Sequence, residues 1–218
     1  MALEALTMTA ETGAGLAEDE RGLVAAARHD PQAAGRLFDR HYPEIIRYIY
    51  HSTLNHSVAE DLTSNVFFAA FRRLGLFRWR GIAFRAWLYR IATNEIRMHF
   101  RRQKRLLATH AGPVDPDHPS DGLTAEAAAA AQDDYRLLHR ALLALGEKYR
   151  TVIVLHYLEG RSLAEIGEIT RRREGTIKSQ LHRGLGQLKQ ALERVGVGPA
   201  ATPAVQPQPQ QPGDLHSV

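Results

Sequence analysis

The sequence contains no cysteine among its 218 residues. Without cysteine the chain cannot form a disulfide framework, a thiolate metal site or a cysteine nucleophile. It has no apolar run close to the ~20 residues that span a bilayer, and its N-terminus is acidic rather than basic as in a secretory signal. We therefore expect a soluble, cytoplasmic protein with no membrane insertion.

Recognisable catalytic and cofactor motifs are also missing. The sequence has no Gly-rich phosphate loop, no Gly-x-Ser-x-Gly and no His-Glu-x-x-His, and its 11 histidines are scattered. We therefore predict that the protein is not an enzyme and has no small-molecule substrate, cofactor or metal. Hydrophobic residues make up 44% of the chain, which is enough for a folded core and excludes a wholly disordered protein.

Positive charge is concentrated in one part of the chain. Residues 72–105 contain eleven Lys or Arg and one acid, a net charge of +10, whereas the whole protein has +4. Residues 1–21 and 106–132 each have a net charge of −4. So basic a stretch is typical of a surface that binds a polyanion such as nucleic acid, although a solvated basic helix has the same composition.

Composition and periodicity divide the chain into five parts. They are an acidic disordered N-terminus (1–21), a helical module (22–105), an acidic linker (106–132), a second helical module (133–195) and a Pro/Gln-rich disordered tail (196–218). No stretch alternates for long enough to predict a sheet. The sequence thus predicts an all-α fold with two small helical domains joined by a flexible linker.

Three helices are predicted in the first module. An apolar series contains Pro43, which we expect to dent or break its helix, and Ser57 and Glu60 form a predicted capping box at the start of the next one. The third helix, over 84–105, has apolar residues on one face. Its opposite face is cationic with one amide, and consists of Arg90, Asn94, Arg97, Arg101 and Lys104.

The second module has the pattern of a helix-turn-helix. A capping box at Ser162 and Glu165 begins a short helix, a break follows at 170–173, and a longer helix comes next. The positions expected to face inward on the longer helix are Ile177, Leu181, Leu185, Leu188 and Leu192. Those off this stripe, free to enter a major groove, are Lys178, Ser179, His182 and Arg183. By itself, the spacing also fits an ordinary helical core.

Two sets of motifs resemble the extracytoplasmic-function (ECF) sigma factors of RNA polymerase. The first set is AEDLTSNVFFAAF (59–71) and FRAWLYRIATN (84–94), and the second is ALGEKYRTVIVL (144–155), SLAEI (162–166) and EGTIKSQLHR (174–183). The resemblance implies a dissociable subunit that binds core RNA polymerase, directs it to a two-part promoter and assists promoter melting. It also implies that an anti-sigma factor is a common further partner, although nothing in the sequence identifies one.

The resemblance also assigns binding residues. Contacts with the −35 element are implied for Arg172, Arg173, Thr176, Lys178, Ser179, His182 and Arg183. Contacts with the −10 element are implied for Phe77, Trp79, Arg80, Arg90, Asn94, Arg97 and Arg101. Contacts with core polymerase are implied for Asp61, Asn65 and Phe68, although Asn65 stands where the family usually has an acid. For Phe77 and Trp79, a place in the hydrophobic core is the simpler interpretation.

Two other functions fit part of the sequence. A stand-alone transcriptional regulator that binds DNA without polymerase would explain the helix-turn-helix but not residues 57–105. A helical interaction or scaffold protein, whose basic stripe binds an acidic partner protein, would show no sequence-dependent DNA binding. Co-elution with core polymerase separates the sigma factor from the regulator.

Overall fold

A computed structural model of the protein describes residues 20–79, 82–109 and 137–194. Within these ranges the regular structure is helical and contains no strand. None of the helices in the described part of the chain is both long enough and apolar enough to cross a membrane. Residues 1–19, most of the predicted linker and the predicted tail lie outside the described residues.

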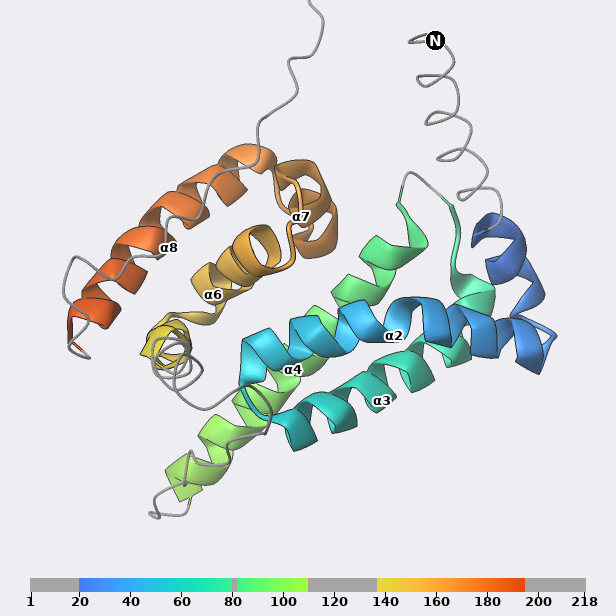
Figure 1. The fold of residues 1–218 in the computed structure, drawn as a ribbon, viewed down its shortest axis with the longest axis horizontal. Helices are drawn as coiled ribbons and strands as arrows, with labels where there is room; N and C mark the ends of the chain where they lie inside the picture. Colours follow the sequence, from blue (N-terminus) through green and yellow to red (C-terminus); the bar gives the residue numbers. More distant parts are fainter. Residues whose placement is uncertain (1–19, 80–81, 110–136, 195–218) are drawn as a thin grey trace, which may run out of the picture.

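The first module is built from α2 (Pro31–Thr53), α3 (His56–Arg73), the short helix η1 (Leu74–Leu76) and α4 (Phe84–Thr109). The three long helices pack against one another (Figure 1). Their shared core includes Leu37 and Ile49 of α2, Val66 of α3 and Leu88 of α4, each fully buried. Residues 20–26, the first two of which we predicted to be disordered, form a further helical stretch before α2.

The predicted signals at α2 and α3 are only partly correct. Pro43 does not break α2, which continues through it because Pro43 itself is exposed while Leu37 and Ile45 on either side are held in the core. The predicted capping box at Ser57 is wrong as well. The side chain of Asn55 caps α3 by accepting a hydrogen bond from the Val58 N–H at 3.0 Å, so the helix begins before Ser57.

Helix α4 confirms the predicted long helix and its apolar face. Phe84, Leu88, Ala92 and Ile96 are buried, as the 3.6-residue period requires. The helix continues to Thr109, four residues into the segment predicted as a linker. It is the longest helix among the described residues and contacts α2 and α3 through its buried face.

The second module contains a helical segment (137–144), α6 (Glu147–Ile153), the π-helix η2 (Val154–Leu158), α7 (Leu163–Thr170) and α8 (Glu174–Arg194). Gly160 has a φ of 63° and ends the helical run, as its sequence context predicted. The capping box at Ser162 is confirmed: its hydroxyl accepts from the Glu165 N–H while the Glu165 carboxylate accepts from the Ser162 N–H.

Helices α7 and α8 with their short turn confirm the predicted helix-turn-helix. Ile177, Leu181 and Leu188 are buried, but Leu185 is 40% exposed, so its predicted inward position is wrong. Gly184 is buried there instead. A Cβ at Gly184 would lie 2.9 Å from Ile153 Cδ1 and 3.2 Å from Tyr149 Cβ, so α8 approaches α6 closely here and a larger side chain would have to displace the Ile153 side chain.

The two modules are in contact with each other. Helix α7 packs against α4, and η2 packs against α2. In Figure 1 the second module lies on the side of α2 and α4 that is turned away from α3. Part of the surface of α4 is therefore covered by the helix-turn-helix.

Candidate nucleic-acid interface

The outward face of α8 presents polar and cationic side chains to solvent. Lys178, His182 and Arg183 are exposed, and so is Thr176, two residues before Lys178. Ser179 is exposed too, with its hydroxyl donating to the Gly175 carbonyl at 2.9 Å. Because buried apolar residues on the opposite side fix α8 against α6 and α7, these side chains project from a rigid helix, as groove recognition requires.

Further cations lie where the chain enters α8. Arg172 and Arg173 are exposed, and Arg171 before them has a left-handed backbone with a φ of 57°. The Arg173 carbonyl accepts the N–H groups of Thr176 and Ile177, at 2.9 and 3.1 Å, and so begins the helix. Exposed guanidinium groups beside a helix N-terminus are suited to bind phosphate.

The predicted cationic face of α4 is divided between solvent and the second module. Asn94 and Arg101 are exposed. The Arg90 Nε–H donates to the Glu168 carbonyl of α7 at 2.6 Å, and the Arg97 Nε–H donates to the Glu147 carboxylate at 2.6 Å. Our prediction that Arg90 and Arg97 lie on an open stripe is therefore wrong for this arrangement, because the second module packs over them.

Burial changes the ionisation of Arg90. Its pKa is lowered mainly because burial at the contact between the modules penalises the charged form, and the nearby charge of Arg171 lowers it further. A guanidinium remains charged at neutral pH even so. Arg90 therefore stays a cation, able to exchange the Glu168 carbonyl for another acceptor.

The aromatic residues before α4 divide between core and surface. Phe77 is buried, with its ring edge-on to those of Trp79 and Phe84. It is a core residue here and is not accessible to a base, which corrects its predicted contact with the −10 element. Trp79 is half-buried, with the Arg21 guanidinium 5.3 Å from its ring centre. Arg80 lies outside the described residues.

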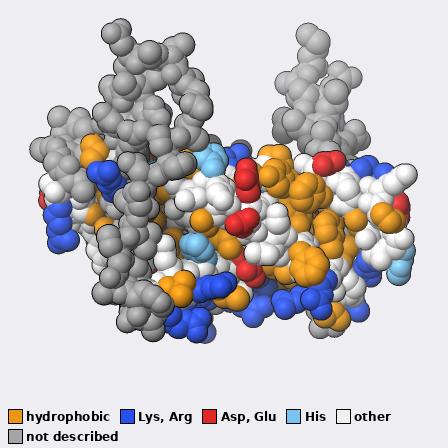
Figure 2. Space-filling model, turned by 90° about the horizontal axis from the view of Figure 1, so that it is seen from below, with side chains coloured by type: hydrophobic (Ala, Val, Ile, Leu, Met, Phe, Trp, Pro, Cys, Tyr) orange, Lys and Arg blue, Asp and Glu red, His pale blue; other side chains and the backbone are white. Residues whose placement is uncertain are grey.

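The third predicted surface lies on α3. Asp61, Asn65 and Phe68 are spaced so that they share one face of the helix, and all three are exposed. The ring of Phe68 is 64% exposed, with the Arg72 guanidinium 5.5 Å from its centre. The exposed ring of Phe68 is available for contact with a partner. Figure 2 shows one face of the molecule on which hydrophobic side chains are exposed and Lys and Arg gather along the lower edge.

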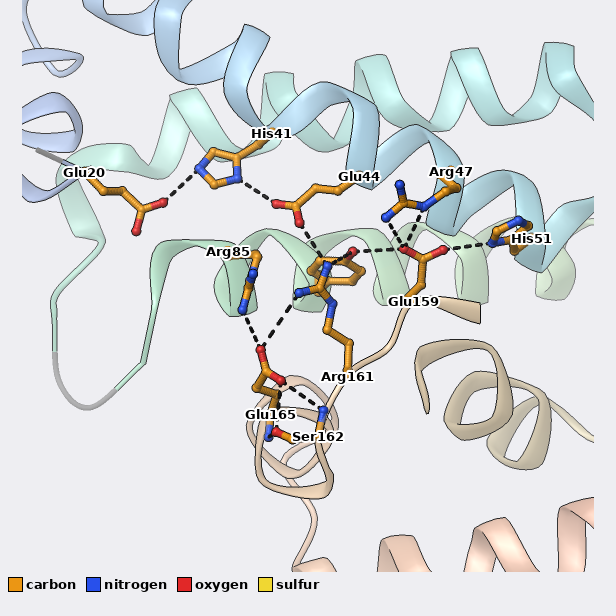
Figure 3. Close-up of polar contacts among 11 residues, drawn as sticks. Glu20, His41, Glu44, Arg47, His51, Arg85, Glu159, Arg161, Ser162 and Glu165 are labelled. Carbon is orange, nitrogen blue, oxygen red and sulfur yellow. Dashed lines mark hydrogen bonds and ion pairs between the residues drawn. The ribbon is translucent and has the colours of Figure 1, made fainter. Parts of the chain in front are cut away.

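Sequence reasoning missed the polar residues that join the modules. The acids Glu147, Glu159 and Glu165 of the second module pair with bases of the first. Arg161 pairs with Glu44, and Figure 3 shows this pair together with those of Glu159 and Glu165. These partners are 50 to 117 residues apart in the chain. No local spacing signals such pairs, because they depend on how two folded modules dock.

Both modules match known sequence families. The Sigma-70 region 2 family matches residues 37–106, and the Sigma-70 region 4 family matches residues 135–188. The ECF RNA polymerase sigma factor SigW of Bacillus subtilis is 32% identical over 170 residues, covering 75% of this chain and 90% of SigW. The chain belongs to the ECF RNA polymerase sigma factors. BldN of Streptomyces coelicolor, another member, is 33% identical over 168 residues, and the match spans 75% of this chain but 61% of BldN.

Solved sigma factor structures have the same fold as this ECF sigma factor. RpoE, in its complex with the anti-sigma factor NepR from Bartonella quintana, is 23% identical with a TM-score of 0.58, and the match covers 73% of this chain and 96% of RpoE. CnrH, in complex with the cytosolic domain of CnrY, is 24% identical with a TM-score of 0.56, covering 80% of this chain and 97% of CnrH. The likeness supports the all-α fold of two helical domains.

Family membership decides between the functions left open by the sequence. Sigma factors act with core RNA polymerase on promoter DNA, so the match to regions 2 and 4 favours this function over a stand-alone regulator or a scaffold. Sigma factors are transcription initiation factors, which confirms the prediction that the protein is not an enzyme. From here on we call the two modules region 2 and region 4.

Proposed function

We propose that this sigma factor recognises promoters in the cytoplasm with α8 on the −35 element, α4 on the −10 element and α3 on core polymerase. The observation that carries the proposal is the outward face of α8. It combines Lys178, His182 and Arg183 on the second helix of a helix-turn-helix, and all three are exposed. A helix of this kind reads base edges in the major groove, where an arginine can bind a guanine with two hydrogen bonds.

The proposed DNA contacts of α8 are of two kinds, contacts with bases and contacts with phosphates. Arg183 and His182 lie more than two turns into the helix and are assigned to base edges, with Lys178, Ser179 and Thr176 before them. Arg172 and Arg173 precede the helix and are assigned to phosphates. Phosphate contacts position the protein without carrying sequence information, so the two groups respond differently to mutation.

The −10 element is assigned to α4 and the residues just before it. Asn94 and Arg101 are exposed and ready for a base edge and a phosphate, respectively. Arg90 and Arg97 join them once region 4 moves away, since both now bind region 4. Trp79 and Arg80 are assigned to an unstacked base, which needs an aromatic or apolar pocket to hold it.

Core polymerase is assigned to the exposed face of α3. Phe68 supplies the apolar contact there, and Asp61 and Asn65 supply polar contacts around it. An exposed aromatic ring surrounded by polar groups is the usual composition of an interface hot spot. That an anti-sigma factor also binds the protein stays a prediction.

The experiment is transcription by holoenzyme reconstituted from core polymerase and the purified protein on a library of random promoters. We expect enriched −35 and −10 sequences. Arg183→Ala should relax the preference at one −35 position by about 1–3 kcal/mol. Lys189→Ala is the matched control, because Lys189 is exposed on the same helix but lies nearly two turns further on. Unchanged −35 preference in Arg183→Ala, or no enriched sequence at all, would contradict the proposal.

A further inference from the structure

The helical stretch before α2 packs against region 2 and reaches the loop that leads from η1 to α4. We name residues 20–28 the brace. Leu23 and Val24 of the brace are buried in the hydrophobic core, at 8% and 0% exposure. The Glu20 carboxylate lies 3.0 Å from Nε2 of His41, a buried residue of α2 (Figure 3). Apolar burial and this polar pair therefore fix the brace on region 2.

One arginine of the brace holds the backbone of the loop. Arg28 Nη2 donates to the Phe77 carbonyl at 3.1 Å, although the two residues are 49 positions apart in the chain. Arg78 Nη1 donates to the same carbonyl at 3.2 Å and to the Gly75 carbonyl at 2.7 Å. The ring of Phe77 is buried in the core. Both the ring and the carbonyl of Phe77 are thus held in place, two residues before Trp79.

A second arginine of the brace lies on the ring of Trp79. The Arg21 guanidinium is 5.3 Å from the centre of this ring, within the range of a cation–π contact. Arg21 is exposed and Trp79 is half-buried, so this contact lies at the surface. The Phe77 ring meets Trp79 edge-on, with 5.2 Å between the ring centres. The orientation of Trp79 is therefore set by a core ring and by a surface cation.

The two arginine contacts are better suited to ordering the loop than to stabilising the fold. A cation–π contact between exposed groups contributes little to the free energy of unfolding. An aromatic ring that is already ordered, by contrast, loses less conformational entropy when a ligand stacks on it. Both Arg21 and Arg28 act on the same three-residue segment, which ends at Trp79. Their common effect is to hold this ring in one orientation.

We propose that Arg21 and Arg28 are positioning residues, which hold Trp79 ready to stack on an unstacked base of the −10 element. The inference rests on the proposed role of Trp79 in capturing that base. It assigns a part in promoter binding to the brace, which lies before residues 37–106 that match region 2. Neither arginine binds the base, because each acts through the loop.

The first measurement reports on the Trp79 ring in the free, full-length protein. The sequence contains two tryptophans, so Trp87→Phe leaves Trp79 as the only one. We expect acrylamide to quench its fluorescence more strongly after Arg21→Ala or Arg28→Ala, because the ring is released. Arg21→Lys keeps a cation near the ring and should restore the parental quenching. The matched control is Arg36→Ala, since Arg36 is an exposed arginine on α2 outside this contact.

The second measurement is the binding of holoenzyme to a single-stranded oligonucleotide that carries the −10 sequence selected from the promoter library. The holoenzyme is reconstituted from core polymerase and the full chain. A scan with abasic sites identifies the captured base, whose removal should weaken binding by the parent about tenfold. Trp79→Ala should abolish this penalty. The scan therefore tests the proposed role of Trp79 separately from that of the brace.

The brace variants are then measured on intact and abasic oligonucleotides in parallel. Arg21→Ala should weaken binding to the intact oligonucleotide about two- to fivefold, and Arg28→Ala should cause a loss of the same order. Neither variant should weaken binding to the oligonucleotide that lacks the captured base, because the two changes remove one shared interaction. Arg21→Lys should again behave as the parent does. An arginine that bound a DNA phosphate directly would lose the same factor on both oligonucleotides.

The outcomes distinguish the brace from the proposed function. If no base shows a penalty that depends on Trp79, base capture by this residue is refuted, and the inference falls with it. If such a base exists but Arg21→Ala and Arg28→Ala bind the intact oligonucleotide as the parent does, only the positioning role is overturned. Equal losses on intact and abasic oligonucleotides would overturn it as well, and so would unchanged acrylamide quenching in both alanine variants.

Discussion

Gly167 offers a stringent test of the helix-turn-helix geometry. The turn after α7 folds back over this residue, so that the Gly167 carbonyl accepts the N–H groups of Arg171 and Arg172. A Cβ added at Gly167 would lie 2.8 Å from the carbonyl oxygen of Arg172. That oxygen belongs to the backbone and cannot rotate away as the end of a side chain could. Gly167→Ala must therefore displace the turn.

The loss of stability caused by this clash can be separated from the general effect of replacing a glycine in a helix. Alanine in place of glycine within a helix stabilises by about 1 kcal/mol. Gly186 on α8 is exposed with no atom near its missing Cβ, so Gly186→Ala should show this gain in full. Gly167→Ala should show the same gain less an overpacking cost of about 1–3 kcal/mol. The difference between the two variants then measures the clash alone.

Urea denaturation of the full chain, followed by circular dichroism, measures both variants against the parent. We expect Gly186→Ala to be more stable by about 1 kcal/mol and Gly167→Ala to be less stable than Gly186→Ala by about 1–3 kcal/mol. The displaced turn should also weaken −35 binding, because it carries the arginines that precede α8. Equal stabilisation by the two substitutions would refute the close approach of the Arg172 carbonyl to Gly167.

Three further predictions concern single residues. Arg171→Gly should stabilise the protein by about 1 kcal/mol in urea denaturation, because its φ of 57° is unfavourable for a residue with a Cβ; unchanged or lower stability would contradict this. Phe68→Ala should weaken binding to core polymerase about tenfold while leaving the urea midpoint nearly unchanged, since the ring is 64% exposed. A clear fall in the urea midpoint together with the loss of affinity would place Phe68 in the core. Burial, together with the charge of His51, lowers the pKa of His139 from 6.5 to about 4. Neutral His139 therefore contributes to the stability of the folded protein above pH ~6.5, and this contribution is lost as the pH falls towards 4. Up to about 3 kcal/mol of the free energy of unfolding should be lost between pH 7 and pH 4, and His139→Leu should lose correspondingly less over the same range.

Elements with a strong local signal were predicted well. The apolar period of α4 identified its buried face, and the Ser162 capping box identified the start of α7. Both signals depend only on residues within a turn or two of each other. The errors at Ser57 and Leu185 are also local: Asn55 is the N-cap of α3, and Gly184 is buried against α6 in place of Leu185.

Only part of the candidate DNA surface on α4 was predicted correctly, and the reason is not a local one. Charge and helical period together identify which side of α4 is cationic, but not what faces it. Asn94 and Arg101 face solvent, whereas Arg90 and Arg97 face region 4. That distinction depends on the docking of two domains, which no short window of sequence encodes.

The composition of the contact between the regions is compatible with the proposed second use of Arg97, as a DNA contact. Glu147 faces Arg97, so a carboxylate occupies the position where the proposed −10 contact would place a phosphate. A phosphate accepts from guanidinium with the same geometry as a carboxylate, and can therefore replace it without a change in the arginine side chain. A nonpolar contact would leave no such exchange, because its opening would expose apolar surface to water. Higher salt should thus loosen the domain contact and the DNA contact alike, and a closed form unaffected by salt would argue against this exchange.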